Sequence, residues 1–181
     1  MSENDLKKQV LDSLTGHFTI TPEFEGLFEF EGERRKVFVD FLLEPSSEII
    51  NNYDMPKGKY IVEAKYLKNL SIPELSDLFI QCLTYKNSKF HDEYPVGVFI
   101  YTNLDYTFHP ETMDSRMLEI MLCTFGKVNI GRLELSRNDF TFLLHKGDIL
   151  FRFKNNEYKK VRRDLLSISF GSGNNKLTKK Y

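Results

Sequence analysis

The chain contains no tryptophan, only two cysteines and only six prolines among its 181 residues. Two cysteines are too few for a disulfide framework, and Cys82 and Cys123 do not form a CxxC pair. We therefore expect reduced, buried thiols in a cytoplasmic protein, and we exclude a four-cysteine iron–sulfur cluster as a cofactor. The sequence also has no GxxxxGKS loop, GxSxG elbow or dinucleotide fingerprint, which argues against those nucleotide-binding and hydrolase classes.

Long hydrophobic runs are missing as well. No stretch approaches the roughly 18 uncharged apolar residues of a membrane span, and the opening MSENDLKKQV has no apolar signal segment. We expect an untargeted chain with no membrane partner. The four histidines, His17, His91, His109 and His145, show no HxH, HxxH or HExxH spacing. Surface or hydrogen-bonded histidines are therefore expected in place of metal ligands.

The chain lacks an excess of one charge sign, because 25 basic residues oppose 26 acidic residues. This balance excludes a histone-like polycation. It is uneven, however, since residues 152–181 carry nine Lys and Arg against two acids. Lys159, Lys160, Arg162 and Arg163 are candidates for holding a nucleic-acid backbone, with binding that weakens steeply as salt rises. The alternative is a solvated basic tail.

Hydrophobic periodicity predicts an α/β protein with a central mixed β-sheet flanked by helices. We expect one domain over residues 1–155, ending in a C-terminal β-hairpin, and a basic extension over 156–181 that begins as a short helix. Helices are predicted at 3–15, 74–90 and 112–125, and strands at 24–31, 37–45, 59–67, 96–103, 128–135 and on both sides of the 146–148 turn. The stretch from Pro45 to Gly58 is expected to be irregular.

Two of the predicted strands carry ionisable residues where a buried sheet favours apolar ones. Strict alternation in VFVDFLLEP places Asp40 on the face opposite Val37, Val39, Phe41 and Leu43. In KYIVEAKYL, Glu63 and Lys65 emerge on the same face, about 6–7 Å apart along the strand. Glu44 lies too far along its strand to join Asp40, and a solvated strand end is expected there.

Charged groups buried in neighbouring strands cost several kcal/mol per ion unless they are paired or bind a metal. Two carboxylates that converge from adjacent strands suit Mg²⁺, which prefers oxygen ligands and retains water. A lysine two residues from one ligand can orient that water toward a phosphodiester. The structural alternative is a salt bridge between strands at a sheet edge.

Asp40, followed by Glu63-Ala64-Lys65 on consecutive strands between an N-terminal helix and a long helix, resembles the PD-(D/E)XK nuclease superfamily. The resemblance implies a restriction-endonuclease-like core and a nuclease that uses Mg²⁺ or Mn²⁺. It also implies that Asp40 and Glu63 bind metal with help from the Ala64 carbonyl, and that Lys65 activates the attacking water.

A second motif lies on the following helix, where Gln81 and Tyr85 form a QxxxY spacing similar to that of the RecB-like and lambda-exonuclease-like branch. The resemblance implies that both side chains contact the active site or the nucleic-acid backbone. Residues at i and i+4 share one helix face, so an ordinary polar face with a core-edge tyrosine is the alternative.

The chain departs from the family pattern in two places. Val39 stands where the eponymous proline would precede the aspartate. A third carboxylate stays unassigned, since the candidates on the first helix and first strand are not singled out by spacing: Glu3, Asp5, Asp12, Glu25 and Glu29.

The leading hypothesis is a Mg²⁺-dependent nuclease, with DNA favoured over RNA through the resemblance alone. A non-catalytic module that binds nucleic acid or protein on the same fold is one alternative. A dimeric restriction-type endonuclease is another, which would make the chain a homo-oligomer.

Overall fold

The computed structural model describes residues 1–68, 71–104, 115–137, 139–144 and 149–160. Helices and strands are mixed along these residues. Their order is α1 (Glu3–Leu14), β1 (Phe18–Phe30), β2 (Glu33–Pro45), α2 (Ser47–Tyr53), β3 (Tyr60–Lys65), α3 (Ile72–Lys86), β4 (Ser88–Lys89), β5 (Gly97–Thr102), α4 (Ser115–Lys127), β6 (Ile130–Ser136), β7 (Asp139–Leu143), β8 (Ile149–Lys154) and β9 (Glu157–Lys160).

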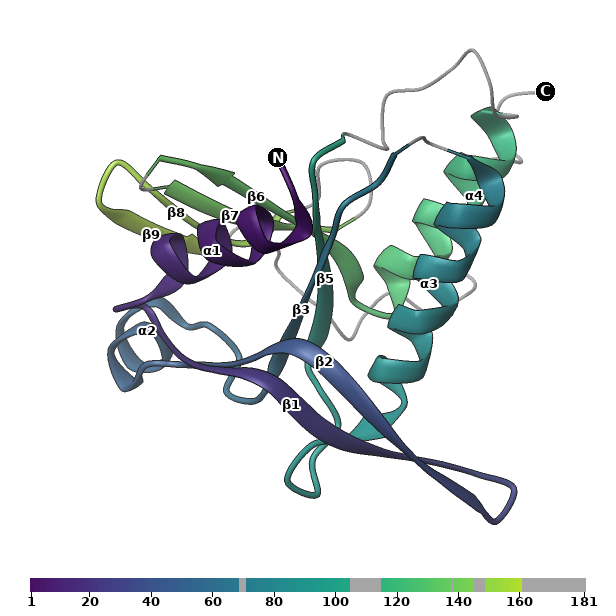
Figure 1. Cartoon of the computed structure of the whole chain (residues 1–181). Helices are drawn as coiled ribbons and strands as arrows, with labels where there is room; N and C mark the ends of the chain where they lie inside the picture. Colours follow the sequence, from purple (N-terminus) through teal and green to yellow (C-terminus); the bar gives the residue numbers. More distant parts are fainter. Residues whose placement is uncertain (69–70, 105–114, 138, 145–148, 161–181) are drawn as a thin grey trace, which may run out of the picture.

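All described strands join one mixed sheet in the order β4-β1-β2-β3-β5-β6-β7-β8-β9 (Figure 1). β3, β5 and β6 run parallel, whereas the pairs on either side of them are antiparallel. Parallel pairing of β3 and β5 requires a crossover, which α3 supplies. The predicted α/β class and mixed sheet are confirmed, and β7 and β8 form the expected antiparallel hairpin.

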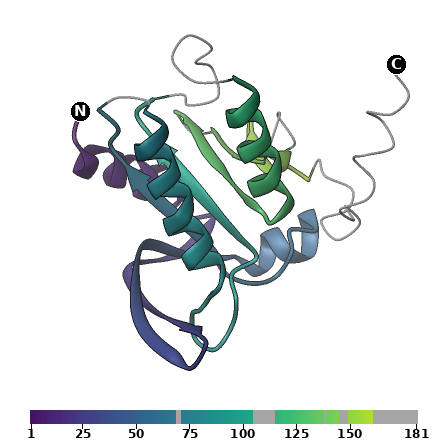
Figure 2. The ribbon, with the colours of Figure 1, turned by 90° about the vertical axis from the view of Figure 1, so that its right-hand side faces the viewer.

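Helices cover both faces of the sheet and create two hydrophobic cores. α3 and α4 lie side by side over one face (Figures 1 and 2), and the Phe79 and Phe125 rings stack between them at 4.3 Å. α1 covers the other face through Leu6, Val10 and Leu14, all fully buried. A helix amphipathic on one stripe can bury only that stripe, so the sheet needs helices from both sides.

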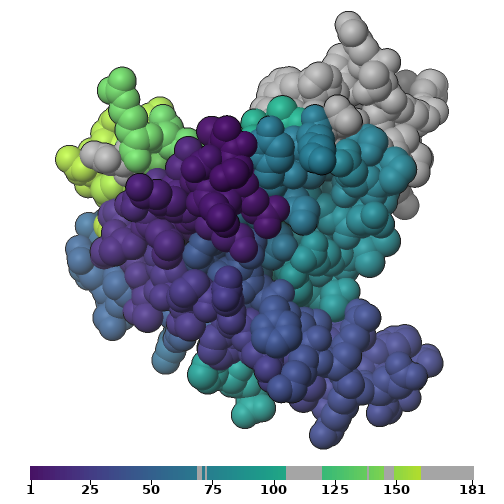
Figure 3. Space-filling view, in the orientation of Figure 1, coloured from purple at the N-terminus to yellow at the C-terminus, as the bar shows by residue number. Residues whose placement is uncertain are grey.

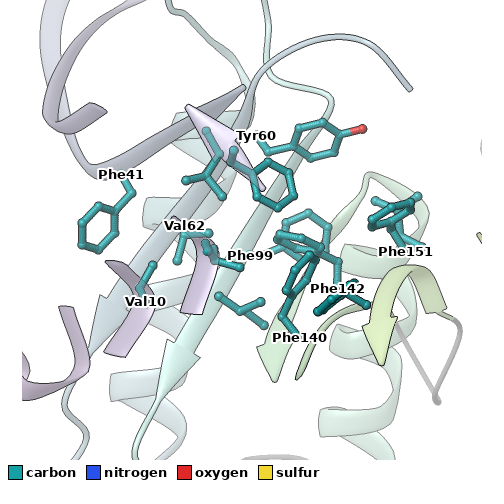
Figure 4. Close-up of a cluster of buried hydrophobic side chains, with 14 of the residues drawn as sticks. Val10, Phe41, Tyr60, Val62, Phe99, Phe140, Phe142 and Phe151 are labelled. Carbon is teal, nitrogen blue, oxygen red and sulfur yellow. The ribbon is translucent and has the colours of Figure 1, made fainter. Parts of the chain in front are cut away.

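The core under α1 is dominated by aromatic rings (Figure 4). Phe142 is fully buried and its ring meets those of Phe18, Tyr60, Phe99 and Phe140. The Phe99 contact is edge-to-face at 4.7 Å, the arrangement that the charge distribution of aromatic rings favours. This cluster holds the C-terminal strands against α1.

Serine residues cap the N-termini of α1 and α3, the two helices that contribute side chains to the candidate site. Ser2 and Asp5 form a reciprocal capping box at the start of α1. Ser71 accepts a hydrogen bond from the Glu74 backbone amide, and Pro73 occupies the first turn of α3.

Several stretches differ from the sequence prediction. β1 begins at Phe18, six residues before the predicted strand, and Ser88–Lys89, within the predicted helix 74–90, is strand β4. Residues 47–53 form helix α2, not an irregular segment, because Ser46 caps the helix and Ile49 is buried in the α1-side core. The short helix predicted after residue 155 is wrong, since Glu157–Lys160 is strand β9. Asn155 and Asn156 both have positive φ, the signature of a tight hairpin turn, and the sheet therefore extends to Lys160, beyond the expected boundary at 155.

Cys82 is fully buried and Cys123 is half-buried. Glu44 is exposed, as expected for a solvated strand end. Among the described residues, no helix combines the length and apolarity needed to cross a membrane.

Gly131 in β6 lies where the backbone of β7 approaches most closely. A Cβ placed on it would be 2.0 Å from the Leu143 carbonyl oxygen, next to the register shift between Phe142 and Leu143. We expect Gly131→Ala to lower the free energy of unfolding by about 3 kcal/mol, because backbone cannot move aside as a side chain can. Urea unfolding measures this loss. Ser136→Ala, at the exposed end of the same strand, is the control and should change stability by less than about 0.5 kcal/mol.

Candidate functional site

At Asp40, the buried side chains of β2 switch from one hydrophobic core to the other. Val37 and Val39 belong to the core under α3, whereas Phe41 and Leu43 belong to the core under α1. The prediction that these four residues share one face is therefore wrong. The strand turns between Val39 and Phe41, and Asp40 lies at the turn, from which a carboxylate can reach elements on both sides of the sheet.

The neighbouring strand turns at the same place. In β1, Phe18 and Ile20 pack in the α1-side core and Phe24 in the α3-side core, and Glu23 between them has a φ of 49°. The pairing register of β1 and β2 is the same before and after this point. The two strands thus bend as a ribbon, and the far end of the hairpin projects from the body of the protein (Figures 1 and 3).

Asp40 uses both carboxylate oxygens. Its Oδ1 lies 2.5 Å from the Lys7 Nζ of α1, and its Oδ2 accepts a hydrogen bond of 2.9 Å from the Ala64 backbone amide of β3. The described pairing of β2 with β3 covers Phe41–Leu43 and stops before Asp40. Between Phe41 and Leu43, backbone groups of β2 pair with β3. At Ala64, the Asp40 side chain accepts the backbone amide in place of a β2 carbonyl, and this hydrogen bond fixes β3 beside the turn.

Glu63 is buried, with 6% of its surface exposed. Its Oε1 accepts a hydrogen bond of 2.8 Å from Gln81 Nε2, whereas its Oε2 has no hydrogen-bond partner among the described residues. Burial raises the pKa of the Glu63 carboxyl from 4.5 to about 7, and the negative charge of Asp40 adds to this increase. A buried carboxylate oxygen without a donor is costly and is a position where a cation would be stabilising.

Gln81 and Tyr85 lie one turn apart on α3, as their spacing predicts, and both lie at the Glu63 side chain. Gln81 Nε2 is 2.8 Å from Glu63 Oε1 and 2.5 Å from the Tyr85 hydroxyl oxygen. Burial, with a contribution from Glu63, raises the pKa of Tyr85, which stays protonated. The structure thus brings the QxxxY pair to the carboxylate, although its role in chemistry stays a prediction.

Lys65 ends β3 and reaches the edge of the site. Its side chain is 44% exposed, and its Nζ lies 3.8 Å from the Glu3 carboxylate of α1. Just beyond it, the Asn103 side chain accepts a hydrogen bond from the Leu67 amide and donates one to the Leu67 carbonyl. This two-way contact continues the β3–β5 pairing past Lys65 and holds the end of the strand in place.

Sequence reasoning missed Lys7 and left Glu3 as one of several carboxylates. Glu3 and Lys7 are four residues apart and share one face of α1, and α1 packs so that both reach β2 and β3. Of the other candidates for a third carboxylate, Glu25 pairs with Lys36 and Glu29 with Arg34, all on the projecting hairpin. The spacing of Glu3 and Lys7 is visible in the sequence, but the packing of the helix onto the strands is not.

The alternative of a salt bridge between strands at a sheet edge does not match the structure. β2 and β3 lie in the interior of the sheet order. Asp40 pairs with Lys7 and Lys65 pairs with Glu3, so each ion pair links a strand to α1 instead of linking the two strands.

The donor set has the chemistry that a hard divalent cation requires. The described residues contain no group of three or more His, Cys, Asp and Glu side chains that could hold a metal ion. Asp40 and Glu63 nevertheless present two carboxylates from adjacent strands, one with an unpartnered oxygen. Mg²⁺ is usually bound by one or two carboxylates with water completing its shell, so these residues fit it. The Ala64 carbonyl as a further ligand stays a prediction.

The predicted nucleic-acid-binding residues are only partly within the described chain. Lys159 and Lys160 lie on β9, whereas Arg162 and Arg163 fall outside the described residues. β9 is the edge strand, five strand spacings from β3, or about 24 Å along the sheet. Lys159 faces Arg152 across the β8–β9 pair, which makes a basic edge remote from Asp40 and Glu63.

Comparisons with protein-family models, with curated proteins and with solved structures found no match for this chain. Function is therefore inferred from the side chains around Asp40 and Glu63.

Proposed function

We propose that this protein is a Mg²⁺-dependent nuclease of the PD-(D/E)XK type that hydrolyses phosphodiester bonds. One observation carries the proposal. The Glu63 carboxylate is buried, near the charge of Asp40 and two residues before Lys65, and one of its oxygens has no hydrogen-bond partner in the described part of the chain. Carboxyl groups with pKa values raised by burial are found mostly at functional sites. Burying such a group without a ligand destabilises the fold, so it is retained where it has a function.

The order of elements supports a restriction-endonuclease-like core as part of this proposal. α1 precedes three antiparallel strands, and α3 then crosses to β5, which is parallel to β3. Asp40 lies on the second of these strands, and Glu63 and Lys65 lie on the third. This is the arrangement that the motif resemblance implies.

Each side chain has a role that its position allows. Asp40 and Glu63 hold Mg²⁺ or Mn²⁺, with the Ala64 carbonyl as a third oxygen. The bound ion supplies Lewis-acid polarisation of the phosphate and a water of lowered pKa. Lys65 orients the attacking water through a hydrogen bond from its ammonium group.

Gln81 and Tyr85 orient the Glu63 carboxylate and do not bind the metal themselves. Gln81 fixes the Glu63 carboxylate through its 2.8 Å hydrogen bond, and Tyr85 fixes Gln81 from the next turn of α3. Side chains that hold a ligand in one orientation raise its affinity for metal.

DNA is the proposed substrate in preference to RNA on the strength of the resemblance. Lys159, Lys160, Arg162 and Arg163 would hold the phosphate backbone away from the site of cleavage, independently of base sequence. Binding should then weaken steeply as salt is raised.

The test is a cleavage assay of the full chain with Mg²⁺, Mn²⁺ or EDTA on single- and double-stranded DNA and on RNA. We expect metal-dependent cleavage of DNA, reduced about a hundredfold in Asp40→Asn because one ligand oxygen becomes an amide nitrogen. Discrete fragments in place of progressive degradation would identify a restriction-type endonuclease. A wild type that binds DNA without cutting it, or an Asp40→Asn variant with full activity, contradicts the proposed metal site.

A further inference from the structure

Lys7 is held at Asp40 by the packing of α1. The residue before it, Leu6, is 1% exposed, and Val10 one turn later is fully buried in the α1-side core. The Tyr101 hydroxyl of β5 also donates a hydrogen bond to the Gln9 side chain. Lys7 therefore projects from a helix anchored on both sides of it, and its ammonium group lies within reach of the Asp40 carboxylate whenever the helix is docked.

Both carboxylate oxygens of Asp40 already have partners, and the ammonium group of Lys7 is one of them. Asp40 Oδ2 accepts the Ala64 amide at 2.9 Å, and Oδ1 contacts Lys7 Nζ at 2.5 Å. Glu63 Oε2, in contrast, has no hydrogen-bond partner among the described residues. A cation shared by Asp40 and Glu63 has Glu63 Oε2 available at once, but it gains Asp40 Oδ1 only if Lys7 moves, because two cations at one oxygen repel.

We propose that Lys7 is a displaceable counter-ion that neutralises Asp40 in the metal-free protein and competes with the divalent cation for Asp40 Oδ1. This inference rests on the proposed function, because it takes Asp40 and Glu63 as the metal ligands. Lys7 keeps the two neighbouring carboxylates compatible with folding before metal is present, and it lowers the affinity for metal by the strength of its ion pair with Asp40.

Mn²⁺ binding to the full chain, without nucleic acid, tests this competition. Titration by calorimetry or by electron paramagnetic resonance would compare the wild type with Lys7→Met and Lys8→Met. Lys8 is the exposed neighbour of Lys7 on the same helix, so Lys8→Met removes the same charge without touching Asp40. We expect Lys7→Met to bind Mn²⁺ about tenfold more tightly, the order of a partly buried ion pair, and Lys8→Met to bind like the wild type.

Thermal unfolding in EDTA gives an independent readout. The metal-free Lys7→Met protein should unfold at a lower temperature than the wild type, because Asp40 loses its counter-ion, and saturating Mn²⁺ should bring the two midpoints together. Lys7→Gln serves as a second variant that retains hydrogen-bonding capacity without charge, and it should behave like Lys7→Met.

The outcomes separate the two proposals. Equal or weaker Mn²⁺ binding in both Lys7 variants overturns the counter-ion role while leaving the metal site intact, and so does tighter binding in Lys8→Met of the same size. If the wild type does not bind Mn²⁺, or if Asp40→Asn binds it as well as the wild type does, the metal site itself is wrong and both proposals fall.

Discussion

Glu63→Gln is expected to abolish metal-dependent cleavage and to stabilise the metal-free protein above pH 7. The loss of activity should reach at least about a thousandfold, because removing a charged ligand removes several kcal/mol of stabilisation by the metal. The gain in stability arises because Glu63 is buried and one of its carboxylate oxygens finds no hydrogen-bond partner among the residues that the structure describes. Opposite effects of one substitution on activity and stability are characteristic of a functional residue.

The stability effect depends on pH in a defined direction. Burial raises the pKa of Glu63 from 4.5 to about 7, so between these values the folded protein keeps a proton that the unfolded chain releases. Stability therefore falls as pH rises through this window, and the cost is complete above pH 7, where it reaches about 3 kcal/mol. Below pH 4.5 the carboxyl is protonated in both states and makes no such contribution. Glutamine does not titrate and is free of this cost.

The measurement is urea unfolding of wild type and Glu63→Gln in EDTA at pH 4.5 and pH 8.5. The difference in stability between the two proteins should change by about 3 kcal/mol between these pH values, in favour of the variant at pH 8.5. Glu44→Gln changes an exposed carboxylate on the same sheet and should show neither effect. A difference that is the same at both pH values contradicts the assignment of a perturbed carboxyl to Glu63.

Lys65→Met is expected to reduce cleavage by about a thousandfold while leaving metal binding and stability close to the wild type. A positioned acid or base contributes roughly 10²–10⁴ to a rate, and methionine keeps the length of the side chain without a group that can exchange a proton. Lys65 is 44% exposed and its one described ion pair, with Glu3, is long at 3.8 Å. Its removal should therefore change stability by less than about 1 kcal/mol.

Steady-state kinetics distinguish this role from a contribution to substrate binding. We expect Lys65→Met to lower kcat with little change in KM, and Mn²⁺ affinity should stay within about threefold of the wild type. Lys68→Met, three residues along and also exposed, is the matched control and should retain kcat. If both lysine variants lower kcat equally, the effect is one of local charge, and Lys65 is not the residue that orients water.

Local patterns predicted a large part of the fold. The helix predicted at 74–90 overlaps α3 and the strand predicted at 96–103 overlaps β5, since hydrophobic periodicity acts over a few residues. α2 and β9 were missed for a similar local reason. Ser46, which caps α2, and the Asn155-Asn156 turn are both visible in the sequence. Each lies among charged and polar residues without clear hydrophobic periodicity, so neither element was predicted.

The sequence also predicted which residues meet at the candidate site. Asp40, Glu63, Gln81 and Tyr85 were selected from their positions on strands and a helix, and the structure brings them together. Alternation failed at Asp40 because it assumes a straight strand, whereas the β1–β2 ribbon turns there. The turn depends on the two hydrophobic cores that lie on opposite faces of the sheet. The sequence of one strand does not show which core each of its residues joins.

By itself, the sequence determined the α/β class, the strands that carry Asp40, Glu63 and Lys65, and the helix that carries Gln81 and Tyr85, because all of these follow from short-range periodicity. Only the tertiary structure decided that Lys7 neutralises Asp40, that Glu3 faces Lys65, and that one oxygen of Glu63 has no partner within the described segments. These contacts join residues that are 33 to 62 positions apart or depend on what surrounds a buried atom. They are set by how α1 packs across β2 and β3, and that packing is decided by the whole hydrophobic core.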